Sequence, residues 1–240
     1  MRRLGLVPYG EALELQKALV EERRAGHVPD LLLVLQHPPV ITLGVRRDSR
    51  SHVTATEGQL ALHGIEVHET GRGGDVTYHG PGQLVVYPIV DLRSKLRKDV
   101  HRYVRNLEMT AIRTLEDFNL EGARRPPYTG IWIGDKKIAA IGVAVRRCIT
   151  FHGLALNVNT TLSYFNRIVP CGLAWADVTS MQKELGAEQN LAKVRERFLL
   201  NFAEVFGYDD LKEYFEDRIG KLKDGSDDLN VLNYLNGLNG

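Results

Sequence analysis

GIWIGDKKIAAIGVAV, at residues 130–145, has the pattern of two β-strands joined by a tight turn. Residues 130–133 and 138–145 are rich in Ile and Val, which favour extended backbone. Gly134 and Asp135 between them are typical of the short turn in a β-hairpin. The stretch therefore predicts a hairpin, and with it an antiparallel part of a sheet.

Segments on both sides of this hairpin predict further strands and only a few helices. Apolar residues at helical spacing predict helices at 9–24, 99–118 and 190–206. Strands are predicted at 31–35, 40–43, 65–69, 83–90 and 150–158. The strand with Pro88 should lie at an edge or bulge there, because proline cannot donate an N–H, and 124–127 is predicted to be a loop. The pattern indicates an α+β fold with a mixed, largely antiparallel sheet.

The size and charge of the chain limit its class. At 240 residues it fits one generous domain, which we assign to residues 1–219, and 220–240 is predicted to be a loosely ordered tail. A net charge of +1 argues against binding nucleic acid by bulk attraction, and no apolar run could span a membrane. No signal-peptide pattern follows Met1, and only two cysteines are present. We therefore expect a soluble, cytoplasmic protein with reduced thiols.

A glycine-rich loop, RGGDVTYHGPGQ at 72–83, is the first segment that could carry chemistry. Its glycines let the backbone approach a ligand closely, and its N–H groups could hold an anion or a carbonyl oxygen. Glycine-rich turns between strands are also common where no ligand binds. The loop does not have the G-x-x-x-x-G-K-[ST] phosphate-binding pattern. Composition alone leaves both interpretations open.

Two adjacent lysines begin the second strand of the predicted hairpin. Strict alternation places Lys137 on the face of Ala139 and Ile141, and Lys136 on the opposite face. One of the two must therefore point the same way as small apolar side chains. Burial disfavours the ammonium form of a lysine, which is one way to prepare it as a proton acceptor. The alternative is that both lysines are solubilising residues at the end of a turn.

The two cysteines differ in their local sequence. Cys171 lies in PCG, which predicts a turn that exposes the sulfur and leaves N–H groups free to stabilise a thiolate. Cys148 lies in the alternating stretch 141–151 and is expected to be a half-buried filler. His79 or His152 could serve as the base for a thiol, although a hydrogen-bonded structural histidine is commoner.

Four motifs occur together in this chain: RGGDVTYHGPGQLVVYPI at 72–89, KIAAIGV at 137–143, HGLALNV at 152–158 and IVPCGL at 168–173. Their sequence and order resemble the lipoyl(octanoyl) transferase family. The resemblance runs from about Gly5 to about Tyr208 and includes DVTSMQKELG at 177–186. It implies the fold of the biotin and lipoate protein ligases, a mixed sheet flanked by helices.

The resemblance also implies roles for individual residues. Cys171 matches the family's nucleophile, which carries the acyl group as a thioester, and Lys137 matches the lysine that activates this thiol. The residues that match the family's acyl-binding segments are Arg72, Gly73, Gly74, Asp75, Val76, Thr77, Tyr78, His79, Ala140, Ile141, Gly142, Gly153, Leu154 and Ala155.

The implied activity is transfer of an octanoyl or lipoyl group from the thioester of acyl carrier protein to a specific protein lysine, the first step of protein lipoylation. The implied acceptors are lipoyl domains of 2-oxoacid dehydrogenases and the glycine-cleavage carrier protein. Conversion of a thioester to an amide is downhill, so no ATP, metal or other cofactor is expected, and neither nucleic acid nor membrane is an expected partner. Arginine pairs at 46–47, 124–125 and 146–147 could attract an acidic carrier protein or could simply be solvated.

Three other functions fit parts of the sequence. A lipoate or biotin ligase of the same fold would activate a free acid with ATP, and would not need the cysteine in PCGL. A cysteine–histidine thioesterase, with His79 or His152 as its base, would release free octanoate with or without an acceptor. A non-catalytic module that binds the carrier protein would leave Cys171 with ordinary thiol reactivity.

Overall fold

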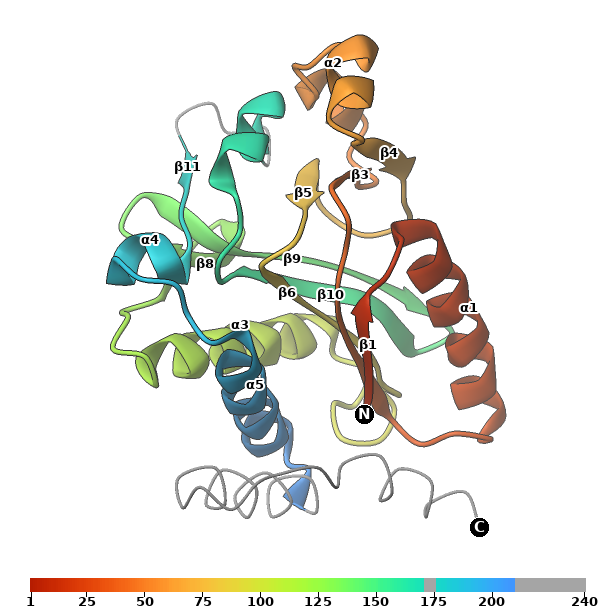
Figure 1. Ribbon diagram of the computed structural model, residues 1–240. Coiled ribbons are helices and arrows are strands. Elements are labelled where there is room, and N and C mark those ends of the chain that lie inside the picture. Colours follow the sequence, from red (N-terminus) through yellow and green to blue (C-terminus); the bar gives the residue numbers. More distant parts are fainter. Residues whose placement is uncertain (171–175, 210–240) are drawn as a thin grey trace.

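The main sheet contains eight strands among the residues that the structure, a computed structural model, describes: 1–170 and 176–209. They are β1 (Arg2–Leu6), β2 (Leu31–Gln36), β6 (Gln83–Ile89), β7 (Ala123–Arg125), β8 (Tyr128–Ile133), β9 (Lys136–Arg146), β10 (Ile149–Asn157) and β11 (Asp177–Val178). Their order is β1-β2-β6-β10-β9-β8-β7, with β11 paired to β9 (Figure 1). Only β1/β2 and β9/β11 are parallel, so the prediction of a mixed, largely antiparallel sheet is confirmed.

A second, smaller sheet lies beside the main one in Figure 1. It contains β3 (Val40–Leu43), β4 (Glu66–Glu69) and β5 (Thr77–His79) in the order β4-β3-β5. The short helices η1 (Ser49–His52), α2 (Glu57–Leu62) and η2 (Leu162–Arg167) accompany it, and Ile41, Tyr78 and Phe165 lie in its core. The strands predicted on either side of His37-Pro38-Pro39 both form, but in different sheets.

Helices cover both faces of the main sheet. Helix α1 (Tyr9–Ala25) lies on one side, and α3 (Val100–Glu116) and α5 (Leu191–Phe206) lie on the other (Figure 1). The alternation of β2 explains this, because Leu32 and Val34 pack with α3 and α5 while Leu33 and Leu35 pack with α1. A short helix, α4 (Met181–Leu185), follows β11. Within the described ranges, no helix has the length and apolar character that crossing a membrane requires.

The three helices predicted from apolar spacing are confirmed. Asp99 and Asn190 cap α3 and α5 by accepting a hydrogen bond from a backbone N–H of the first turn. Gly26 and Gly207 end α1 and α5 in the left-handed conformation that glycine adopts readily. Local sequence thus fixes where these helices begin and end. The predicted tail, 220–240, lies outside the described residues.

The prediction that the strand with Pro88 lies at an edge is wrong, because β6 lies between β2 and β10. On one side Pro88 is paired with Leu32. On the other side the register with β10 places His152 opposite Pro88, and His152 has a φ of 55° and donates its N–H to Gln16 Oε1 at 2.7 Å. The irregularity that proline requires is therefore in the neighbouring strand.

Two further predictions need correction. Part of the predicted loop 124–127 is strand, because Ala123–Arg125 forms β7 on the edge of the main sheet. Cys148 is half-buried as expected, but it lies with Arg147 in the turn between β9 and β10 and not within a strand. Both turn residues have positive φ, 50° and 71°, as the tight turns that match the twist of a hairpin require.

Gly153 should be intolerant of any side chain because β6 passes too close to it. A Cβ at this position would lie 2.3 Å from the Val86 carbonyl oxygen and 2.7 Å from Pro88 Cδ. We expect Gly153→Ala to lower the free energy of unfolding by about 2–3 kcal/mol, measured from the urea midpoint. The matched control is Gly58→Ala in α2, where a Cβ meets nothing within 4 Å. An unchanged midpoint for Gly153→Ala would contradict the close packing described here.

Candidate active site

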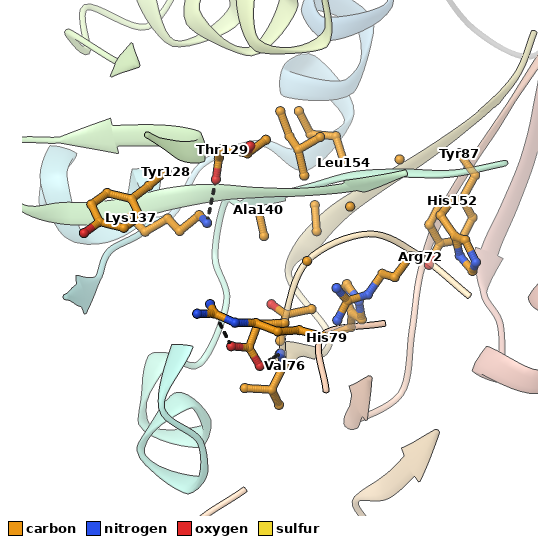
Figure 2. A pocket seen from close by; sticks show the side chains of 18 of the residues that line it. Arg72, Val76, His79, Tyr87, Tyr128, Thr129, Lys137, Ala140, His152 and Leu154 are labelled. Carbon is orange, nitrogen blue, oxygen red and sulfur yellow. Dashed lines mark hydrogen bonds and ion pairs between the residues drawn. The ribbon is translucent and has the colours of Figure 1, made fainter. Parts of the chain in front are cut away.

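A central cavity lies between the glycine-rich loop and strands β9 and β10 (Figure 2). Lys137 lines it, as do all the residues that the sequence assigned to acyl binding except Gly73 and Tyr78. Seven further lining residues were not assigned to acyl binding from the sequence: Tyr9, Arg46, Tyr87, Pro127, Tyr128, Thr129 and His152. Segments that are far apart in the chain thus converge on one site.

Gly73 and Tyr78 have other places in the structure. The ring of Tyr78 stacks on Tyr164, with ring centroids 5.2 Å apart, and meets Phe165 edge-on in the core of the small sheet. The Gly73 N–H donates to the Val143 carbonyl at 2.8 Å. Gly73 therefore ties the loop to β9, and Tyr78 anchors β5.

The glycine-rich loop is fixed in place by its first residue and by a glycine of β9. Arg72 is buried, and its guanidinium Nη2 donates to the Thr42 carbonyl at 2.7 Å. A Cβ on Gly142 would lie 2.8 Å from the Gly73 carbonyl oxygen and 3.0 Å from Arg72 Cδ. Only glycine at 142 lets the loop cross β9 this closely.

Lys137 is buried, with 7% of its surface exposed, and its Nζ donates to the Thr129 carbonyl at 2.8 Å (Figure 2). Lys136 instead forms an ion pair with Glu184 at 3.3 Å. Of the two adjacent lysines, Lys137 is therefore the buried one. The Lys137 Nζ also lies 5.4 Å from the centre of the Trp132 ring.

The strict alternation predicted for this strand is wrong. Ile131 pairs with Ala139 but Trp132 pairs with Lys137, so β9 has one extra residue opposite β8. Because of this bulge, Ala140 lines the cavity together with Lys137, while Ala139 packs in the core between the sheet and α3.

Cys171 lies outside the described residues, but the residues on both sides of 171–175 lie beside Lys137. Pro170 lines a small cavity together with Lys137. On the other side, β11 pairs with the start of β9, where Val178 is opposite Lys137 and the Thr179 N–H donates to the Lys137 carbonyl at 2.9 Å. The described residues that flank 171–175 thus contact the strand that holds the buried lysine.

Aromatic rings and histidines occupy the part of the cavity away from Lys137, where Figure 2 shows His152 and Tyr87. His37 Nε2 lies 2.8 Å from the Tyr87 hydroxyl, and His79 Nδ1 lies 2.7 Å from Gln83 Oε1. His152 is 1% exposed, and its ring nitrogens have no hydrogen-bond partner within the described residues. Within the same residues, no three or more His, Cys, Asp or Glu side chains are grouped to hold a metal ion.

Burial keeps these histidines neutral. It lowers the pKa of His37 and His152 to about 4 and that of His79 to about 3, from an ordinary value of 6.5. A group with such a pKa accepts a proton poorly at neutral pH. The chemistry of the site therefore disfavours His79 and His152 as bases for a thiol.

The family model of the lipoyl protein ligase A/B catalytic domain matches residues 8–203. The octanoyltransferase of Rubrobacter xylanophilus is 51% identical over 209 residues, which cover 86% of this chain and 93% of that protein. The octanoyltransferase of Thermoanaerobacter sp. strain X514 is 47% identical over 205 residues, covering 85% and 89% of the two chains. The chain belongs to the lipoyl protein ligase A/B catalytic domain family. Its relatives within that family are octanoyltransferases, so the predicted class, an acyltransferase of protein lipoylation, is confirmed.

Solved structures share the fold at low sequence identity. Lipoate-protein ligase A bound with ATP has a TM-score of 0.67 and 17% identity, covering 85% of this chain and 84% of that one. The bipartite lipoate protein ligase of Thermoplasma acidophilum has a TM-score of 0.66 and 17% identity, covering 95% and 97%. Biotin protein ligase from Aquifex aeolicus has a TM-score of 0.53 and 14% identity, covering 90% and 71%. The predicted fold of the biotin and lipoate ligases is therefore confirmed.

Proposed function

We propose that the chain moves an octanoyl group from the thioester of acyl carrier protein to a lysine of a lipoyl domain, through an octanoyl thioester on Cys171. The observation that carries this proposal is the buried Lys137, which lines the central cavity and lies beside the described residues that flank Cys171. The octanoyltransferase relatives support the same activity. The glycine-cleavage carrier protein is a second acceptor in this proposal, and the cytoplasm is its location.

The reaction has two acyl transfers. The Cys171 thiolate attacks the carbonyl carbon of the carrier thioester, and the carrier thiol leaves with a proton. The acceptor amine then attacks the new thioester, an amide forms and Cys171 is released. Lys137 accepts the proton of the Cys171 thiol and passes it to the leaving carrier sulfur in the first transfer. In the second transfer it accepts a proton from the attacking amine and passes it to the Cys171 sulfur. The Thr129 carbonyl holds its Nζ during both steps.

The middle of the cavity suits a medium-length acyl chain. Val76, Ala140, Leu154 and Ala155 line it, and burial of each methylene contributes about 0.8 kcal/mol. Beyond them lies the buried, polar ring of His152. An acyl chain long enough to reach His152 would gain no comparable binding free energy there, because an alkyl group offers this imidazole no hydrogen bond.

Intact mass spectrometry tests the proposal. Mixed with octanoyl carrier protein and no ATP, the protein should gain one octanoyl group, which a lipoyl-domain or glycine-cleavage acceptor then removes. Cys171→Ser should abolish the gain, and Cys148→Ser, the matched control, should keep it. Two results would overturn the proposal: an adduct that survives in Cys171→Ser, or acylation of the acceptor only with free octanoate and ATP.

A further inference from the structure

Glu108 is a carboxylate with no exposed surface, on the side of α3 that packs against the main sheet. Arg105 Nη1 and Arg124 Nε both donate to its Oε2, at 2.6 Å and 2.8 Å. These two guanidinium groups compensate the charge, which could not otherwise be buried without a large cost. Its other oxygen, Oε1, is left to face the backbone of β8.

The group that Oε1 contacts is the peptide that holds Lys137. The Gly130 N–H donates to Glu108 Oε1 at 3.3 Å, and the carbonyl of the same peptide unit, that of Thr129, accepts from Lys137 Nζ at 2.8 Å. A peptide unit is planar, so a contact that fixes its N–H also fixes its carbonyl. Hydrogen bonds in such a chain polarise one another, and a carboxylate at the N–H makes the carbonyl a better acceptor.

Because residue 130 is glycine, the Thr129–Gly130 peptide can lie directly against the Lys137 side chain. The φ of Gly130 is 120°, and a Cβ there would lie 2.5 Å from Lys137 Cε and 3.1 Å from Nζ. The peptide therefore packs directly against the stem of the lysine, and any rotation of the peptide would displace the Nζ. Glu108, which does not line the cavity, thus acts on Lys137 through the backbone.

We propose that Glu108 is a positioning residue for Lys137, holding the Thr129–Gly130 peptide so that its carbonyl fixes the Nζ for proton transfer. This inference rests on the proposed function of Lys137. Arg105 and Arg124 hold the carboxylate in place, and Arg124 Nη2 also donates to the Arg105 carbonyl at 3.0 Å.

Two substitutions separate the hydrogen bond from the charge. Glu108→Gln keeps an oxygen that can accept from Gly130 and removes the charge. Glu108→Asp keeps the charge but is one methylene too short to reach the peptide. We expect Glu108→Asp to form octanoyl-enzyme about ten- to hundredfold more slowly, since a small misplacement of a reacting group has effects of this size. Glu108→Gln should remain within about threefold of the unsubstituted protein.

The measurement is single-turnover acylation by intact mass at several pH values, with the KM for octanoyl carrier protein. A positioning role changes the rate and the pH profile and leaves KM unchanged. Alkylation of Cys171 by iodoacetamide in a Cys148→Ser background should slow in parallel. The control for loss of a buried ion pair is Glu196→Gln in α5, where Glu196 pairs with Arg3 at 2.8 Å, and it should leave the acylation rate unchanged.

The outcomes distinguish the two proposals. If the unsubstituted protein forms no adduct at Cys171, the proposed function fails. If it does, and Glu108→Asp acylates as fast as the unsubstituted protein or is slower only in proportion to a loss of folded protein in urea, this inference alone fails. A slower Glu108→Gln than Glu108→Asp would also overturn it, because charge and not the peptide contact would then be what matters.

Discussion

Replacing Lys137 with methionine should slow formation of the octanoyl-enzyme by about 10²- to 10⁴-fold, the usual contribution of a positioned acid–base group. Methionine fills much of the same space but can neither accept a proton nor donate to the Thr129 carbonyl. The fold should remain, because methionine is an apolar side chain of similar length at a buried position. Single-turnover acylation followed by intact mass measures the effect directly.

Lys137→Arg separates proton transfer from charge. Arginine keeps the positive charge but effectively never gives up its proton, so this variant should be as slow as methionine to within about tenfold. Lys136→Met is the matched control, because Lys136 is the neighbouring lysine and pairs with Glu184 outside the cavity. A Lys137→Met protein that acylates within about threefold of the unsubstituted one would exclude Lys137 from the reaction.

Acidification should destabilise the fold at pH values well above those at which carboxylates are protonated. His37, His79 and His152 have pKa values of about 4, 3 and 4 in the folded protein and the ordinary 6.5 when unfolded. Between about pH 4 and 6.5 the unfolded chain therefore binds more protons than the folded protein. The contribution of the neutral histidines to the free energy of unfolding is complete above pH 6.5 and is lost as the pH falls. From about pH 7.5 to 5.5 the free energy of unfolding should fall by about 1.4 kcal/mol for each histidine, roughly 4 kcal/mol for the three together.

Urea unfolding at both pH values measures this loss. His37→Gln should reduce it by about one third, because glutamine does not titrate. His101→Gln should leave it unchanged, since His101 is exposed at the start of α3. A stability that is the same at both pH values would show that these histidines are not held neutral in the folded state.

The parts of the fold that could be predicted are those with a long local pattern. Helices α1, α3 and α5 repeat their apolar residues over many turns, and the β8–β9 hairpin has a turn of its own. The strands β1, β5, β7 and β11 were not predicted, because their two to five residues contain no apolar run, unlike those of the equally short β3. The central position of β6 was missed because its irregularity is in β10, and a sequence does not show which strand adapts.

In the candidate site, too, the residues that local sequence motifs mark could be predicted, and those placed by contacts between distant segments could not. Motifs could nominate Lys137 and most of the cavity lining, because those residues are contiguous in the chain. Tyr9 and Tyr87 belong to elements whose pattern indicates only structure, so no local signal marks them. The partner of Lys137 is the Thr129 carbonyl, and a backbone group leaves no trace in residue identity. The bulge that turns Ala140 toward Lys137 also depends on pairing with a distant strand.

The ion pairs of the buried Glu108 with Arg105 and Arg124 have a consequence for how this chain can diverge. Arg105 is exposed and Arg124 is half-buried, and loss of either one leaves the Glu108 carboxylate paired with the other. Loss of both arginines would leave an uncompensated charge in the core, which typically costs about 3–5 kcal/mol. Either arginine should therefore be replaceable alone but not both together, and a library of single substitutions would understate how much the two contribute to the fold.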